Sequence, residues 1–413
     1  MRKYTTDKLS RMGRRRFLQT MVTLGVTGTG LNYMTKDALA DLTNNPESEV
    51  PRLGYLEHTN HEAVENGTQA PRKEPIYYTI SRDKWRVVET AHDAAARIDD
   101  LLDAKFDSSL FQTGVTTITS GHRRKKAVHV DYVVQRDDDG NVLAEPSAAI
   151  EAVRDALPAT VTGVAGRDDF ETKVEDIPVL VEKREVSSGS TSGGAYSDFY
   201  YDYQYRPVPA SAAYKNEAEG TICTMGTPAY DNERNDYVMV TAGHCMTDSG
   251  QDIHQPDLYN QIGNSTSEFQ DNDDETFDAG VISLSADHTY RFADNDGDND
   301  YSITPIYGTL SWTTIKDNEG NSDYSMMYRG AKSGHVNTYI EKADSNEQYF
   351  WLENDSGDGD SGCPMYHVRF SGGDGRAYIG GINEGYYYSP KDGDIDCAGT
   401  YIGKIEDRYS LDV

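Results

Sequence analysis

The stretch "GDGDSGCP", residues 357–364, decides how the rest of this sequence is interpreted. Within it Ser361 follows Asp360 and precedes Gly362. A serine hydroxyl is a weak nucleophile at neutral pH. A chemical role for Ser361 therefore requires a neighbouring base, an acid that orients the base, and N–H donors for a developing oxyanion. These partners must come from elsewhere in the chain.

A candidate base and a candidate acid each stand beside an apolar run. His244 follows such a run in "VMVTAGHCMT" (238–247), and Asp278 precedes one in "DETFDAGVISLS" (274–285). Taken alone, such a histidine is more often structural, because a backbone carbonyl can satisfy its ring. Asp278 is preferred to the acids of the hydrophilic run before it, since a buried strand follows it directly. The chain order His244, Asp278, Ser361 is one of three in which unrelated folds carry a base, an acid and a nucleophile.

Residues 206–413 are rich in short apolar or alternating segments separated by Gly, Asn and Asp. Segments of this kind are typical of antiparallel strands, and no helical periodicity interrupts them. The sequence therefore predicts an all-β barrel or sandwich here. The clearest strands are "DYVMVTAG" (236–243), "FDAGVISLS" (277–285), "SMMYRGAKSGHVNTYI" (325–340), "EQYFWLE" (347–353) and "GRAYIGGI" (375–382).

The motifs "TAGHC", "FDAGVI" and "GDSGCP", in this order on a β-rich segment, resemble those of the chymotrypsin-like (trypsin-like) serine endopeptidases. The stretch "YRGAKSGHVNTYI" (328–340) is similar to the glycine-rich strand pair of the bacterial, streptogrisin-like branch. The resemblance covers about residues 206–413. It implies a chymotrypsin-like double six-stranded antiparallel β-barrel within a protease domain at 195–413. It also implies protein or peptide substrates, an acyl-enzyme intermediate and no cofactor.

The resemblance assigns a role to each motif residue. His244 takes the proton of Ser361 and later gives it to the leaving amine, while Asp278 fixes the imidazole tautomer. The backbone N–H groups of Gly359 and Ser361 form the oxyanion hole. Asp360 is expected to have a structural part, with its carboxylate compensating a buried positive group.

The specificity pocket is predicted from the same likeness. Counting back from the serine, Asp355 falls where trypsin carries the aspartate of its pocket floor, which would favour Arg or Lys before the scissile bond. Aspartate is abundant in this chain, so a chance match is the alternative. Gly385 and Gly399 are the other predicted pocket residues.

The chain has four cysteines, which allow three pairings. The resemblance pairs Cys223 with Cys245, and this leaves Cys363 with Cys397 as the second bridge. No Cys-x-x-Cys spacing predicts a zinc site. The acidic stretch 294–302 has its glycine fourth rather than sixth, so the EF-hand pattern fails and no metal is expected.

The first forty residues resemble a twin-arginine export signal. "GRRRFLQT" (13–20) precedes a moderately apolar stretch and then "DALAD" (37–41), with small residues suited to a signal peptidase. A membrane anchor is the alternative, but the apolar stretch is too short and too polar. We therefore expect the twin-arginine machinery to export the protein, and a secreted product without a membrane anchor after processing.

Residues 41–194 are predicted to form an α+β region that ends in a linker. Residues 41–75 lack periodicity and are expected to be loosely held, while 187–194 is a Gly/Ser linker. By resemblance to secreted relatives, this region is a propeptide that assists folding or blocks the cleft; a persistent binding domain is the alternative. The elements predicted within it are a helix at 81–106, a strand at 127–135, a turn at 137–141 and a helix at 146–158.

The charge of the chain excludes one class of partner. The 413 residues include 69 acidic and 39 basic ones, a formal net charge of −30. Residues 41–413 alone carry 67 acidic and 31 basic residues, a net charge of −36. Nucleic acid is therefore not an expected partner. Acids spread along the whole chain favour a protein of a halophile over an acidic tail.

A second function competes with hydrolysis. Asn383 and Glu384 in "GGINEG" (380–385) are unusual where the family has its substrate-aligning strand, and Cys363 stands where the family usually has glycine. A catalytically inactive secreted binding protein on the same fold would carry such changes. All three motif residues are present, so the enzyme is the preferred interpretation.

Overall fold

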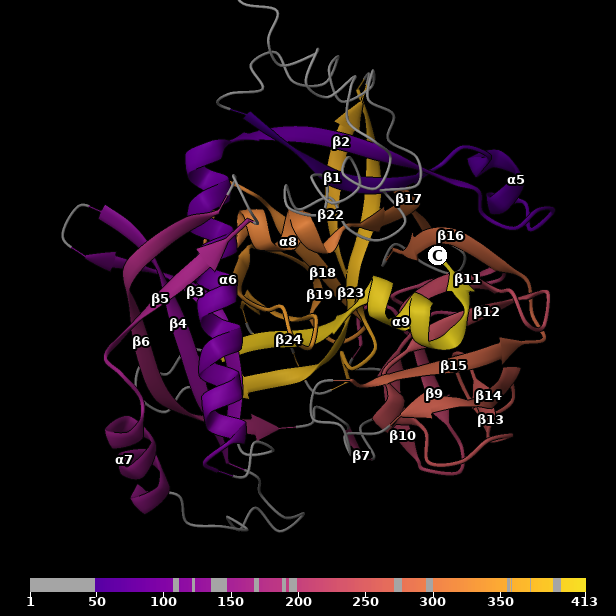
Figure 1. Cartoon of the computed structure of the whole chain (residues 1–413). Coiled ribbons are helices and arrows are strands. Elements are labelled where there is room, and N and C mark those ends of the chain that lie inside the picture. Colours follow the sequence, from indigo (N-terminus) through magenta and orange to yellow (C-terminus); the bar gives the residue numbers. More distant parts are fainter. Residues whose placement is uncertain are drawn as a thin grey trace, which may run out of the picture.

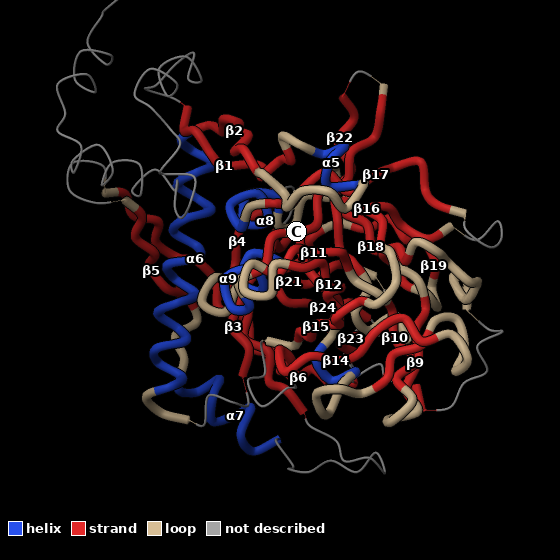
Figure 2. The backbone as a smooth tube through the Cα atoms, turned by 90° about the vertical axis from the view of Figure 1, so that its right-hand side faces the viewer, coloured by secondary structure: helices blue, strands red, loops and turns tan. Residues whose placement is uncertain are grey.

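The computed structural model describes residues 49–413 apart from short ranges. The undescribed ranges are 107–110, 121–122, 135–146, 167–170, 188–190, 193–198, 271–276, 295–299, 355–356, 358, 372 and 389–394. The predicted export signal and the predicted turn at 137–141 thus lie outside the described residues, as does Asp355. Strands dominate the described part (Figure 2). The predicted fold class, all-β with a small α+β region before it, is confirmed.

One of the two sheets has nine strands, and each strand pairs antiparallel with its neighbours. Apolar residues of its central strands face a core that the other sheet shares. The order is β25 (Leu411–Asp412), β11 (Thr227–Asp231), β12 (Asp236–Thr241), β15 (Ala279–Leu284), β14 (Gln261–Gln270), β13 (Asp252–His254), β9 (Ala213–Asn216), β10 (Thr221–Thr224) and β7 (Thr191–Ser192).

The other sheet has sixteen strands and joins the N-terminal region to the C-terminal part of the chain. Its main path runs β19 (Gly334–Thr338), β18 (Met326–Gly330), β22 (Pro364–Ser371), β23 (Asp374–Tyr388), β24 (Ile395–Tyr401), β21 (Tyr349–Glu353), β20 (Ile340–Asp344), β3 (Phe111–Ser120), β4 (Arg123–Val134), β6 (Thr172–Ser187) and β5 (Thr160–Ala165). Off this path lie β1 (Glu49–His58), β2 (Lys73–Ser81), β8 (Val208–Ala210), β16 (His288–Ala293) and β17 (Tyr301–Leu310).

The predicted N-terminal helix is confirmed as α6 (Arg82–Asp103). The Ser81 side chain caps the helix by accepting the Lys84 N–H. The helix lies against β3 to β6 (Figure 1), and its apolar residues pack on these strands. The strand at 127–135 is part of β4, and the second helix is α7 (Ser147–Ala156). The periodicity of these elements is local, so the sequence alone reveals them.

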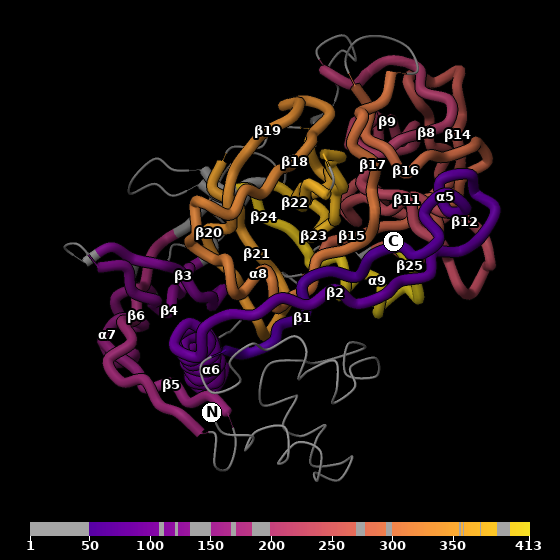
Figure 3. Tube along the Cα trace, turned by 90° about the horizontal axis from the view of Figure 1, so that it is seen from above, coloured from indigo at the N-terminus to yellow at the C-terminus, as the bar shows by residue number. Residues whose placement is uncertain are grey.

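The prediction that residues 41–75 are loosely held is wrong for the described part, which begins at residue 49. β1 and β2 form a long hairpin that runs from α6 across the molecule to α5 (His61–Glu65) (Figure 3). β1 also pairs with β17, where Tyr55 faces Leu310. The hairpin is stable because a strand far away in sequence completes its hydrogen bonds, which local periodicity does not reveal.

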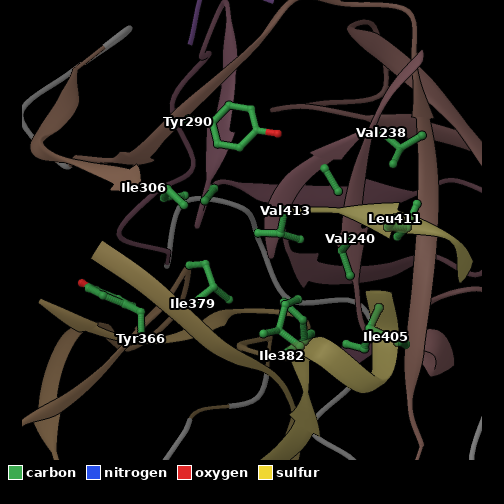
Figure 4. Close-up of a cluster of buried hydrophobic side chains, with 14 of the residues drawn as sticks. Val238, Val240, Tyr290, Ile306, Tyr366, Ile379, Ile382, Ile405, Leu411 and Val413 are labelled. Atoms are coloured by element: carbon green, nitrogen blue, oxygen red, sulfur yellow. The ribbon is translucent and has the colours of Figure 1, made fainter. Parts of the chain in front are cut away.

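Two helices of the C-terminal part were not expected from the sequence. α8 (Trp312–Asn318) has Ser311 as its N-cap, and the Ser311 side chain accepts the Thr314 N–H. α9 (Ile402–Tyr409) precedes β25. Both are short, so their periodicity is weak. Ile405 of α9 packs with Val240, Ile382 and Val413 in the core between the two sheets (Figure 4). No helix in the described part of the chain has the length and apolar character that a bilayer crossing needs.

Candidate active site

Strand pairing brings His244 and Asp278 together. β12 and β15 are antiparallel neighbours with Thr241 facing Gly280, so the end of β12 lies beside the start of β15. His244 follows β12 within a 3-10 turn, and Asp278 directly precedes β15. His244 Nδ1 lies 2.5 Å from Asp278 Oδ2, and the His244 backbone N–H donates to Oδ1 at 2.8 Å. One carboxylate therefore holds both the ring and the backbone of His244.

Asp278 is fully buried. Its own N–H donates to Thr400 Oγ1 at 3.1 Å, which ties the start of β15 to β24 of the other sheet. With Asp278 accepting from Nδ1–H, the lone pair of His244 is on Nε2. The pair thus has the arrangement of a general base and its orienting acid.

Ser361 lies in a tight turn that packs against the residues before His244. Gly359 and Gly362 have φ values of 102° and 90°, which favour glycine. A Cβ added to Gly362 would lie 2.1 Å from Thr241 Oγ1 and 3.0 Å from the Ala242 nitrogen, so no larger residue fits there. Ser361 is fully buried, and its Oγ donates to the Glu384 carbonyl at 3.4 Å.

Thr224 connects the turn of Ser361 to the nine-stranded sheet, a structural role that the sequence did not predict. Its N–H donates to the Ser361 carbonyl and its Oγ1 to the Gly359 carbonyl, both at 2.8 Å. Its Oγ1 also accepts the Ala331 N–H at 3.0 Å. Thr224 therefore holds together three segments that are distant in sequence, through its side chain and its backbone N–H.

Asp360 has a structural part, but not through a buried cation. Oδ1 accepts the N–H groups of Lys332 and Ser333 at 2.8 and 3.0 Å, and Oδ2 accepts the Gly357 N–H at 2.7 Å. Burial raises the pKa of Asp360 above its usual range, and these hydrogen bonds oppose the rise. The expected positive group is replaced by three backbone donors.

Asp360→Asn is therefore expected to destabilise the protein by about 2–4 kcal/mol. The NH₂ group of asparagine replaces one carboxylate oxygen, and it cannot accept a backbone N–H. Denaturant unfolding monitored by fluorescence measures the loss. Asp374→Asn, an exposed aspartate of the same C-terminal part, is the matched control and should leave stability unchanged. Equal unfolding midpoints for the two variants would contradict the role given to Asp360.

Asn383, which departs from the resembled family, braces the same turn. Its carbonyl accepts the Gly362 N–H at 2.7 Å, its N–H donates to the Cys363 carbonyl at 2.9 Å, and Nδ2 donates to the Asp360 carbonyl at 3.2 Å. The Nδ2 hydrogen bond is the part that requires the asparagine side chain, and it gives Asn383 a structural role. Among the described residues, the N–H groups of Gly359 and Ser361 have no hydrogen-bond acceptor.

One of the two predicted disulfides is present. Cys223 and Cys245 are bonded, beside His244, so their sulfurs cannot ligate a metal there. The predicted Cys363–Cys397 bridge is wrong: both are thiols, buried in one apolar cluster. Burial raises the pKa of Cys363 well above its usual range, so this side chain packs as a small hydrophobic residue.

The predicted pocket glycines lie where two strands approach closely. Gly399 of β24 faces Asn383 of β23, and a Cβ at Gly399 would lie 2.0 Å from the Ile382 carbonyl oxygen. Gly385 faces Ala398 in the same pairing. Close packing of β23 on β24 accounts for the absence of a side chain at Gly399.

Comparison with known proteins gives structural neighbours only. No family model matches the sequence, and no curated protein sequence is significantly similar. A Nocardiopsis protease (NAPase) shares 16% identity over 50% of this chain and 97% of its own, with a TM-score of 0.34. A glutamic acid specific serine protease shares 13% over 50% and 100%, with a TM-score of 0.36, and an alpha-lytic protease homologue, N4, shares 14% over 50% and 98%, with a TM-score of 0.34. These values are too low to assign the chain to a family.

Proposed function

We propose that this protein is a secreted serine endopeptidase whose nucleophile is Ser361, whose base is His244 and whose orienting acid is Asp278. The observation that carries the proposal is the double contact of one buried carboxylate with the ring and the backbone N–H of His244. The turn of Ser361 packs directly on the strand end that leads to this histidine.

The proposed reaction is acyl transfer to water. Ser361 Oγ turns from the Glu384 carbonyl to His244 Nε2, loses its proton to that nitrogen and attacks the peptide carbonyl carbon. The Gly359 and Ser361 N–H groups stabilise the oxyanion of the tetrahedral intermediate. His244 then protonates the leaving amine, and water activated by the same nitrogen releases the acyl group.

We also propose that residues 41–194 act as a propeptide that covers the cleft. The end of β6 pairs antiparallel with β23: Ser187 faces Tyr386, and Glu185 faces Tyr388. β23 continues directly from Asn383 and Glu384 beside Ser361. An extended peptide substrate would add to the same strand, so β6 competes with it.

A buried carboxyl group near the contact of α6 with the turn after β20 should make the free energy of unfolding depend on pH. Burial raises the pKa of Asp344 to about 8, with the Asn346 N–H opposing and the carboxylates of Asp99 and Glu347 adding to the rise. Asn346 Nδ2 donates to Asp99 of α6 at 2.8 Å. Asp344 is thus protonated in the folded protein at pH values where it is ionised in the unfolded chain.

The stabilisation from this proton is fully present below pH about 4 and is lost as pH rises through about 8. We expect Asp344→Asn to remove a slope of up to about 1.4 kcal/mol per pH unit between these limits. Unfolding free energies measured from pH 4 to 9 test this. Asp323→Asn, an exposed control, should keep the wild-type slope, and parallel curves for wild type and Asp344→Asn would contradict the prediction.

The function is tested with the protein cut between residues 187 and 199 and freed of its N-terminal region. An organophosphonate probe should label wild type at Ser361 and should not label Ser361→Ala. Hydrolysis of Arg-, Phe- and Glu-ended peptide amides, in molar and in low salt, then gives the cleavage preference. If wild type and Ser361→Ala were equally silent in every buffer, a secreted binding protein would be the better interpretation.

A further inference from the structure

We propose that Glu217, Asp252 and His254 form a binding site for a divalent transition-metal cation such as zinc. The site lies in the nine-stranded sheet, where β13 pairs with β9. Side chains alternate along a strand, so Asp252 and His254 share one face of β13. Glu217 directly follows β9 and donates its N–H to the Asp252 carbonyl at 3.2 Å, which places it opposite Asp252.

The spacing of the three side chains suits one small cation. One ligand atom from each residue lies within 4.8 Å of the other two. His254 Nε2 and Glu217 Oε2 are 3.3 Å apart. Two ligand atoms bound to zinc at ~2.1 Å in tetrahedral geometry are separated by about 3.4 Å. The His254–Glu217 pair therefore already has the separation of two zinc ligands.

His254 supplies an independent indication of a ligand. It is only 5% exposed, and within the described part of the chain neither of its ring nitrogens has a hydrogen-bond partner. The approach of Nε2 to Glu217 is thus not directed as a hydrogen bond. Buried polar groups nearly always have a partner, and an ion is one of the few accepted reasons for an exception.

The carboxylates give the site its access and its orientation. Glu217 and Asp252 are exposed, so a cation can enter from solvent and keep water as a further ligand. Asp252 Oδ1 accepts from Gln261 Nε2 at 2.8 Å and from Asn264 Nδ2 at 2.7 Å. Such outer contacts fix a ligating carboxylate and leave Oδ2 for the metal.

The ligand set selects the class of metal. One imidazole nitrogen and two carboxylate oxygens suit zinc and its neighbours, whereas calcium takes six to eight oxygens. The competing account is a direct contact between His254 and Glu217 without a metal, beside Lys215, which faces His254 across the strand pair. That account predicts no tight metal binding.

A bound metal would stiffen the neighbourhood of His244. Asn216 directly precedes Glu217 and faces Ile253, the residue between Asp252 and His254. Its Nδ2 donates to the Cys245 carbonyl at 3.0 Å. Gln251, next to Asp252, accepts from the same nitrogen at 2.8 Å. The site is thus structural, separate from the catalytic residues but connected to the turn that carries one of them.

Calorimetric titration of the full chain, stripped with a chelator and kept in molar NaCl, tests the site with zinc, manganese and calcium chlorides. We expect one stoichiometric zinc site and binding of calcium at least about 100-fold weaker. His254→Gln and Glu217→Gln should each weaken zinc binding about 100-fold. Zinc should raise the melting temperature of wild type but not of either variant.

Asp248→Asn is the matched control, since Asp248 is exposed and lies four residues before Asp252. It should bind zinc as wild type does. Glu217→Gln changes an exposed side chain, so it tests the site even if the buried His254 variant does not fold. Equal zinc affinity in wild type and Glu217→Gln, or the lack of any stoichiometric site in wild type, would overturn the proposal.

Discussion

Asp278→Asn is expected to lower kcat for peptide amide hydrolysis by about 10⁴-fold with little change in KM. An asparagine oxygen can still accept the His244 backbone N–H, but its NH₂ group then faces Nδ1. The imidazole ring of His244 must then carry its proton on Nε2. No lone pair is left on that nitrogen to accept the proton of Ser361. Steady-state kinetics on the protein freed of residues 41–194 measure the loss.

The matched control is Asp236→Asn, since Asp236 is exposed at the start of β12, the strand that leads to His244. It should retain wild-type kcat. The melting temperature of Asp278→Asn should stay close to that of wild type, which separates a wrong tautomer from misfolding. A kcat within tenfold of wild type would mean that Asp278 does not orient the base.

Arg52→Met is expected to destabilise the chain by about 3–5 kcal/mol, because it leaves the buried carboxylate of Asp317 without its cation, while Glu89 keeps its contact with Lys316. Arg52 is fully buried: Nε and Nη2 each donate to Asp317 of α8 at 2.8 Å, and Nη2 donates to Glu89 of α6 at 2.7 Å. Burial acts to lower the pKa of Arg52, but the two carboxylates outweigh it and raise the pKa above its usual range. Denaturant unfolding measures the effect.

The control for Arg52→Met is Arg86→Met on α6. Arg86 lies 3.7 Å from Asp83 in an exposed pair, so its loss should change stability by less than about 0.5 kcal/mol. Because Arg52 belongs to the N-terminal region and Asp317 to the C-terminal part, Arg52→Met should also speed the separation of the two after cleavage. Equal stability of the two variants would rule out the buried pair as the main link.

Sequence reasoning succeeded where a feature is local. The motifs of His244 and Asp278 are contiguous letters, and the structure brings these two side chains into contact. Their catalytic roles and that of Ser361 stay predictions. The stripe of α6 is equally local. These features depend on neighbours within a few residues, so they can be read without knowing the rest of the fold.

Prediction from the sequence failed where a residue acts through a partner that lies far away along the chain. Thr224 and Asn383 hold the serine turn through backbone groups of other segments, which no motif encodes. β1 has no obvious pattern because β17 completes it. The choice between a disulfide and two packed thiols for Cys363 depends on a few ångströms of side-chain placement, which cysteine counting cannot supply.

The hairpin at the start of the described chain has a consequence for folding kinetics. The Ser311 side chain donates to the Leu53 carbonyl across 258 residues of sequence, at the edge where β1 meets β17. Contacts of such high order are formed late and slowly, since the loop between them must close first. An emerging chain therefore cannot complete this edge until β17 has been made, and an isolated N-terminal fragment should leave β1 without its second neighbour.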